Sequence, residues 1–94
     1  MASAIYITSG TTAAAGADFT LQSSTSRLFY CKPALGSNES LTLDIKNVDG
    51  TYTQVGTLAS SRNQAGTVTA TGAGASTFRV SRSTVSPAKV VYFD

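Results

Sequence analysis

The fold is decided by the stretch SLTLDIKNVDGTYTQVGTL, residues 40–58. Its first half places Leu41, Leu43 and Ile45 on one face, with polar residues at the positions between them. This period of two is typical of a β-strand that has one buried face. The pair Asp49-Gly50 then supplies a tight turn, after which the chain returns in a second alternating segment. The stretch therefore predicts a β-hairpin.

The rest of the chain has the same period. Segments of this kind, separated by turn residues, lie at 4–8, 17–21, 27–32, 67–71, 76–81 and 89–93. We expect Ile5 and Ile7 to share a buried face, and strand 27–32, which is apolar on both sides, to be covered on both. Gly56 predicts a β-bulge in the return strand of the hairpin, and Pro33 ends strand 27–32 because it has no backbone N–H.

About eight short strands at this spacing predict an all-β fold, a small antiparallel β-sandwich or a jelly-roll-like barrel. No segment has a helical periodicity. A chain of 94 residues has room for one core, so residues 1–94 are expected to form a single β domain without a linker. Because a domain of this size buries only about 60% of its unfolded surface, we expect it to form a dimer or trimer.

The composition argues against an enzyme. The chain has no His, 12 charged residues (7 basic and 5 acidic) and 27 Ser and Thr residues, so few groups could transfer a proton near neutral pH. Cys31 has no histidine to activate it and is expected to be a small buried residue. The segment 44–50 has calcium-type oxygen ligands but lacks the closing acidic residue. We therefore predict no catalytic residues, metal or cofactor.

Other partners are also disfavoured. A net charge of +2 is too small for a nucleic-acid surface, and no apolar run reaches the length of a transmembrane helix. The first residues lack the features of a secretory signal, which predicts synthesis in the cytoplasm. The sequon Asn38-Glu39-Ser40 is accordingly interpreted as a turn.

Candidate contact residues are few. Arg79 and Arg82 form the densest basic feature, and Arg79 alternates with apolar neighbours, so it should point away from the core. Tyr52, beside the hairpin turn, is expected to be exposed. An apolar patch around Tyr92 and Phe93 on the last strand would suit a protein interface.

Three stretches carry a family resemblance: the hairpin 43–56, the segment 74–82 and the Val-rich closing strand that ends at Asp94. Together they resemble small virion proteins of tailed bacteriophages, several of which are capsid decoration or cement proteins.

The resemblance implies an accessory structural protein, made in the host cytoplasm, that binds the lattice of the major capsid protein on the outer surface of the virion. Such a protein would bridge adjacent capsomers through many weak contacts, which a symmetric lattice multiplies. The alternative is a carbohydrate- or receptor-binding module of a head or tail fibre, in which exposed tyrosines would stack on sugar rings.

Overall fold

This computed structural model describes residues 4–71 and 74–94, which contain nine β-strands. They are β1 (Ala4–Gly10), β2 (Ala14–Ala15), β3 (Phe19–Leu21), β4 (Ser26–Lys32), β5 (Ser40–Lys46), β6 (Tyr52–Ser60), β7 (Ala65–Thr69), β8 (Ser76–Arg82) and β9 (Lys89–Phe93). The predicted all-β class is confirmed, with no helix among these residues. Within the same ranges there is accordingly no helix long and apolar enough to cross a membrane.

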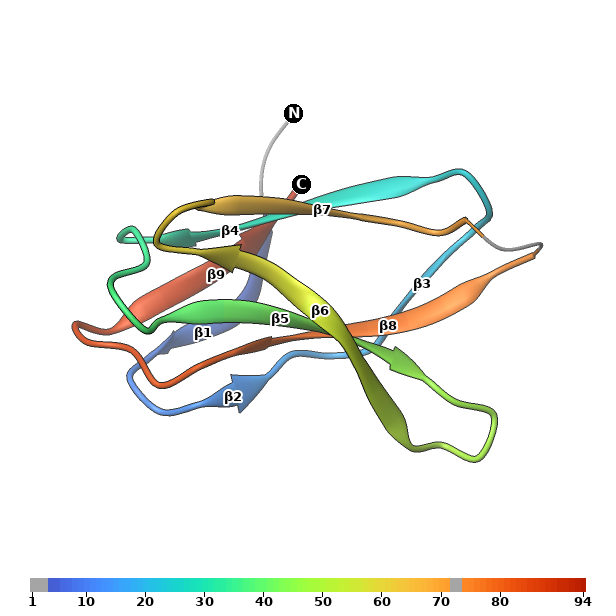
Figure 1. Ribbon diagram of the computed structural model, residues 1–94, viewed down its shortest axis with the longest axis horizontal. Coiled ribbons are helices and arrows are strands. Elements are labelled where there is room, and N and C mark those ends of the chain that lie inside the picture. Colours follow the sequence, from blue (N-terminus) through green and yellow to red (C-terminus); the bar gives the residue numbers. More distant parts are fainter. Residues whose placement is uncertain (1–3, 72–73) are drawn as a thin grey trace.

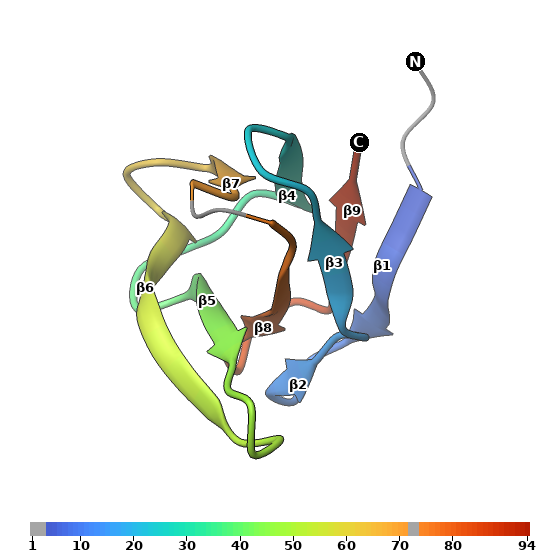
Figure 2. The same ribbon diagram turned by 90° about the vertical axis from the view of Figure 1, so that its right-hand side faces the viewer.

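The strands form two antiparallel sheets. Sheet A has the order β1-β9-β4-β7, and sheet B has the order β2-β8-β5-β6, with β3 also pairing with β8. Figures 1 and 2 show the two sheets as opposite layers, with the core between them. This arrangement is the antiparallel β-sandwich that the strand spacing predicts.

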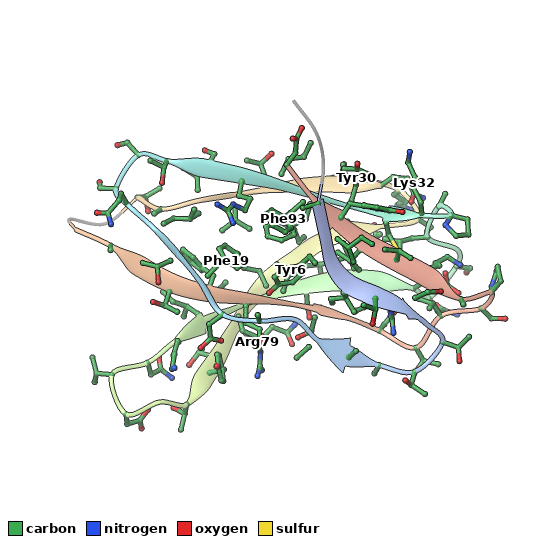
Figure 3. All side chains as sticks on the ribbon, turned by 180° about the vertical axis from the view of Figure 1, so that it is seen from behind. Tyr6, Phe19, Tyr30, Lys32, Arg79 and Phe93 are labelled. Atoms are coloured by element: carbon green, nitrogen blue, oxygen red, sulfur yellow. The ribbon has the colours of Figure 1, made fainter. Side chains whose placement is uncertain are left out.

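The centre of the core is a group of aromatic rings from both sheets. Phe29 of β4 is fully buried, and its ring centroid lies 5.1 Å from that of Phe19 in β3 and 5.1 Å from that of Tyr6 in β1. Phe93 of β9 adds a fourth ring, 5.9 Å from Tyr6. Burial of one such side chain contributes about 1.5–3 kcal/mol, so these rings are a main source of stability. In Figure 3, Tyr6, Phe19 and Phe93 lie between the sheets.

Two expectations about strand faces are wrong. Ile7 is buried but Ile5 is 57% exposed, because the register between β1 and β9 shifts between these two residues. A β-bulge of this kind turns neighbouring side chains to different sides. Strand β4 is buried on its inner face, at Phe29 and Cys31, whereas on its outer face Leu28 is 36% exposed and Tyr30 is half-buried.

Tyr6 links the two sheets where the edge strand of sheet B is interrupted. Between β2 and β3, its hydroxyl accepts a hydrogen bond from the N–H of Val80 at 3.1 Å and donates one to the carbonyl of Ala17 at 2.5 Å. The ring lies so close to Gly16 that a Cβ there would overlap it. A glycine at this position is therefore required by the packing of Tyr6.

The predicted hairpin is present as β5 and β6. Asn47 and Thr51 are joined across the turn by a backbone hydrogen bond of 2.7 Å, and Gly50 has a positive φ of 89°. The register between β5 and β6 shifts beside Gly56, which confirms the bulge predicted there. Figures 1 and 2 both show the end of this hairpin extending beyond the rest of the sandwich.

Candidate functional site

The five residues expected at an interface do not form one site. Tyr52 and Arg79 lie together on the outer face of sheet B, and Tyr92 lies on the outer face of sheet A. Phe93 points into the core, and Arg82 is buried with 3% of its surface exposed. The structure therefore offers two separate surfaces, one on each side of the sandwich. Figure 3 shows Arg79 on one side, with Tyr30 and Lys32 of β4 on the other.

The first surface is a group of polar side chains at the base of the β5–β6 hairpin. We call it the bracing cluster, and its members are Asp18, Asp44, Lys46, Tyr52 and Arg79. The guanidinium of Arg79 lies 3.6 Å from the centroid of the Tyr52 ring and bonds Asp44 Oδ2 at 2.9 and 3.3 Å. Asp18 Oδ1 accepts a 2.6 Å hydrogen bond from the Tyr52 hydroxyl, and its Oδ2 accepts one of 3.1 Å from Lys46 Nζ. Tyr52 is therefore half-buried and fixed, in contrast to the exposed side chain predicted from its position.

The hydrogen bonds of the bracing cluster shift the pKa values of three of its members. Hydrogen bonds from Tyr52 and Lys46 lower the pKa of Asp18, and the bond to Asp18 raises the pKa of both Tyr52 and Lys46. Each shift moves a group further from neutral pH, so these three groups do not change their charge near pH 7. This behaviour suits a structural clamp better than general acid or base chemistry, which needs a pKa near the working pH.

The hairpin turn is stiffened by its own side chains. Asp49 Oδ1 accepts hydrogen bonds from the N–H and the hydroxyl of Thr51, at 3.0 and 2.6 Å. The side-chain amide of Asn47 donates to the hydroxyls of Thr51 and Thr53, at 3.0 and 2.9 Å. The Asp49 and Asn47 side chains thus fix a turn whose residues, 47–51, are all exposed.

Apolar side chains are exposed on this stiff hairpin. Val48 in the turn has a relative exposure of 111%, and Val55 at the bulge is 53% exposed. A shallow groove of about 260 Å³ lies beside the turn, where the end of β5 and the start of β8 separate, and Ile45, Val48 and Ala75 contribute its apolar lining. The hairpin therefore presents apolar groups to solvent in a fixed geometry.

The second surface lies across three strands of sheet A. We call it the aromatic face, and it consists of Ile5, Leu28, Tyr30, Val90 and Tyr92. Ile5, Tyr92 and Tyr30 are direct neighbours in register, from β1, β9 and β4 respectively. Ile5 is 57% exposed and Leu28 36%, and the other three are half-buried. None of the five side chains carries a charge at neutral pH.

The two tyrosines of the aromatic face stack on each other. The centroids of Tyr30 and Tyr92 are 5.3 Å apart, with 18° between the ring planes. Rings this close and nearly parallel overlap in an offset stack, so each covers part of one face of the other. A sugar ring needs an open aromatic face to stack on, so the two ring faces that meet in this stack cannot serve as that platform.

Charged residues mark the two ends of the aromatic face. Lys32 follows Tyr30 along β4 and lies opposite Val90, with its Nζ 5.8 Å from the Tyr30 ring centroid. Asp94 is at the other end, where its N–H donates to the carbonyl of Leu28 at 3.0 Å. Both side chains are exposed. The surface thus has an uncharged centre, a positive end and a negative end.

Arg82 is buried and connects strands, so it does not lie on the surface where a contact was predicted. Its guanidinium donates to the carbonyls of Thr8, Thr12 and Lys89 at 2.7–3.0 Å, which ties β8 to β1 and β9. Its Nε is buried and has no hydrogen-bond partner among the residues that the structure describes. Period two gives a sequence signal for this burial, because Arg82 is two residues after the buried Val80.

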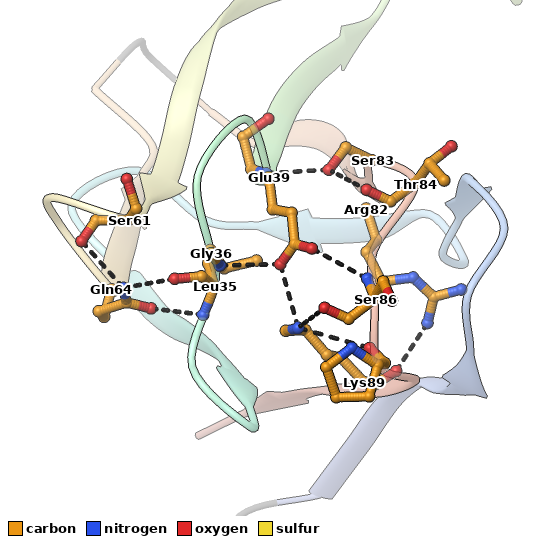
Figure 4. Close-up of polar contacts among 12 residues, drawn as sticks. Leu35, Gly36, Glu39, Ser61, Gln64, Arg82, Ser83, Thr84, Ser86 and Lys89 are labelled. Atoms are coloured by element: carbon orange, nitrogen blue, oxygen red, sulfur yellow. Dashed lines mark hydrogen bonds and ion pairs between the residues drawn. The ribbon is translucent and has the colours of Figure 1, made fainter.

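A second buried charge lies nearby and is paired. Lys89 is 2% exposed, and its Nζ is 3.0 Å from Glu39 Oε1. Glu39 also accepts hydrogen bonds from the backbone N–H groups of Gly36 and Ser86, at 2.8 and 2.9 Å. These bonds, drawn in Figure 4, lower the pKa of Glu39 to about 2. They connect the 33–39 loop to the segment that precedes β9.

The residues considered as a nucleophile or as metal ligands lie in environments that do not suit those roles. Cys31 is buried, and this burial raises the pKa of its thiol, which makes the thiolate a poor nucleophile here. Within residues 4–71 and 74–94, no group of three His, Cys, Asp or Glu side chains could hold a metal ion. Asp44, in the segment with calcium-type spacing, pairs with Arg79 instead.

Comparison of the chain with protein-family models and with curated proteins finds no significant match.

Proposed function

We propose that this protein is an accessory structural protein of a phage virion, which binds the assembled capsid through its β5–β6 hairpin as a decoration or cement protein. The observation that carries the proposal is a rigid hairpin that extends beyond the sandwich and exposes Val48 at its turn. The family resemblance supplies the partner, a lattice of major capsid protein.

Rigidity before binding supports this role. A flexible arm loses conformational entropy when it binds, whereas a hairpin fixed in advance keeps most of its contact energy. Asp18 accepts bonds from both β5 and β6 at the hairpin base, and Asp49 and Asn47 fix the turn. The free end of the hairpin, residues 47–55, is thus held in one geometry although none of its residues is buried.

The low charge of the chain is compatible with a lattice role. Many copies must lie near one another on a shell, and a net charge of +2 per copy keeps their mutual repulsion small. Each hairpin contact can be weak, because symmetric repetition raises the effective concentration of the other contacts.

Sedimentation with empty shells that lack this protein tests the proposal. We expect saturable co-pelleting at a fixed ratio to the shell subunit, and at least a tenfold weaker binding for Val48→Asp, which puts a charge on the apolar end of the hairpin. Ser61→Asp adds the same charge to an exposed loop outside the hairpin and should bind like the parent protein.

Absence of binding to shells would overturn the proposed function. Retention on an immobilised glycan surface, without binding to shells, would assign the protein to the carbohydrate-binding alternative. Equal binding by Val48→Asp and the parent protein would show that the hairpin is not the contact.

A further inference from the structure

The aromatic face is an exposed apolar surface that the hairpin contact does not use. Ile5, Tyr92 and Tyr30 form a continuous row across β1, β9 and β4, and Leu28 and Val90 extend it on both sides. Single exposed apolar residues are common on proteins, but a contiguous group on one sheet face usually marks a contact surface. Tyrosine is also enriched in the centres of protein interfaces.

One edge of each sheet is less suited to association than this face. Strand β1 at the edge of sheet A has two register shifts, and strand β6 at the edge of sheet B has two as well. Bulges bend an edge strand and disrupt the regular spacing that another strand needs in order to pair with it. Edge-to-edge pairing through β1 or β6 is therefore disfavoured relative to a contact between faces.

The charges around the aromatic face make it complementary to itself. Lys32 and Asp94 lie at opposite ends, about 13 Å apart along the strands for four residues at 3.3 Å each. A two-fold axis that lies in the interface and runs across the strands reverses the strand direction of the second copy. The Lys32 end of each copy then meets the Asp94 end of the other, and the tyrosine pairs meet near the axis.

We propose that the aromatic face is the interface of a homodimer in which two copies pack sheet A against sheet A about this axis. Such an interface is isologous, so one complementary pair of ends provides two ion pairs. Face-to-face packing of twisted sheets is a geometry that β-proteins use in their own cores. The uncharged centre of the face suits a second copy of itself, because no charge has to be buried there.

A dimer of this kind would carry two hairpins. In each copy the β5–β6 hairpin belongs to sheet B, on the side of the sandwich opposite the aromatic face. Two binding arms on one particle could contact two capsomers and gain affinity through effective concentration. This use of the dimer rests on the proposed function, whereas the dimer itself does not.

Sedimentation equilibrium of the full chain tests the dimer without any capsid. We expect a mass of two 9.7 kDa chains at high concentration, with dissociation on dilution. Leu28→Asp should raise the dimer dissociation constant at least a hundredfold, because it buries a charge among the apolar side chains of the interface. Ile5→Asp should do the same at a more exposed position, so it serves if Leu28→Asp fails to fold. Val55→Asp, at an equally exposed valine outside the face, should leave the dimer unchanged.

A charge exchange tests the orientation of the two copies. Lys32→Glu should weaken the dimer about tenfold, since it replaces attraction by repulsion at two symmetric places. Combining it with Asp94→Lys should restore the parent dissociation constant, because the exchanged charges meet again across the axis. Failure of the double variant to recover would overturn the proposed axis.

A chain that stays monomeric at millimolar concentration, or a dimer unaffected by folded Leu28→Asp and Ile5→Asp, would overturn the dimer. These outcomes are separate from those of the shell experiment. A dimer that does not bind shells would contradict only the proposed function, and a monomer that binds shells would contradict only this inference.

Discussion

Gly66 of β7 packs directly against the carbonyl group of Leu58 in β6, at the corner where the chain passes from sheet B to sheet A. A Cβ at position 66 would overlap the Leu58 oxygen and the Leu58 side chain. Leu58 itself packs against the core, and Gly66 is paired with Phe29 in sheet A. The absence of a side chain at position 66 therefore sets how closely the two sheets approach.

Replacement of Gly66 by alanine should destabilise the protein. The overlapping atom of Leu58 belongs to the backbone and cannot rotate away, so the strands must separate, at a cost of about 1–3 kcal/mol or more. Gly56→Ala is the matched control, because no atom lies within 4 Å of the Cβ position there. Urea unfolding of both variants measures the difference, and equal stabilities would contradict this account of the corner.

The hydroxyl of Tyr6 should matter more than that of Tyr92. Tyr6→Phe removes the acceptor for the buried N–H of Val80, and an unsatisfied buried donor costs about 1–3 kcal/mol. Tyr92→Phe removes a hydroxyl that makes no hydrogen bond within the described residues, and it should change the free energy of unfolding by less than about 0.5 kcal/mol. Thermal unfolding at neutral pH, in dilute samples, distinguishes the two. A Tyr6→Phe protein as stable as the parent would show that the hydroxyl bridge contributes nothing.

Stability should fall in acid between pH 4.5 and about 2. The pKa of Glu39 falls from 4.5 to about 2 in the folded protein, through hydrogen bonds from Gly36, Ser86 and Lys89. The unfolded chain therefore binds more protons in this window, so the contribution of Glu39 is complete above pH 4.5 and is lost as the pH decreases toward 2. The pKa values of Asp18 and Asp49 are also lowered and act in the same direction.

Glu39→Gln isolates the part due to this carboxylate. The variant should be less stable than the parent protein at neutral pH, because Lys89 stays buried without its anion. Its stability should also depend less on pH between 4.5 and 2. Urea unfolding at several pH values measures both effects, and identical pH profiles for the two proteins would contradict the role given to Glu39.

Charge reversal at Arg79 should lower stability. Arg79→Glu places a carboxylate beside Asp44 and removes the cation from the Tyr52 ring, for an expected cost of about 1–2 kcal/mol after allowance for partial exposure. Arg62→Glu changes the same charge on an exposed loop and should leave the free energy of unfolding within about 0.5 kcal/mol. Similar stabilities for the two variants would mean that the bracing cluster does not hold the hairpin.

Most strands could be predicted from the sequence because their signals are local. The alternation at 40–46, the Asp49-Gly50 turn and the bulge at Gly56 depend on neighbouring residues, and all are present. The side on which Ile5 lies was not predictable in this way, because the bulge in β1 arises from its pairing with β9. A single extra residue in a strand reverses the faces that follow it.

The candidate surfaces were less predictable because each is assembled from distant segments. Tyr52 and Arg79 were identified singly, but their contact with Asp18 requires β3, β6 and β8 to be placed together. The row of Ile5, Tyr92 and Tyr30 likewise depends on the order of strands in sheet A. Sequence periodicity gives the side of a strand and does not give its neighbours.

The strand order of sheet A has a consequence for folding during synthesis. Its two halves, β1 at the start of the chain and β4 with β7 in the middle, both pair through β9, the last strand. A nascent chain therefore cannot complete this sheet until residues 89–93 have left the ribosome, and a fragment that ends earlier leaves Phe29 and Ile7 without their cover. Long loop closures of this kind slow folding. Completion of sheet A is thus expected to follow synthesis of the β9 segment, and chains truncated before it should unfold more readily.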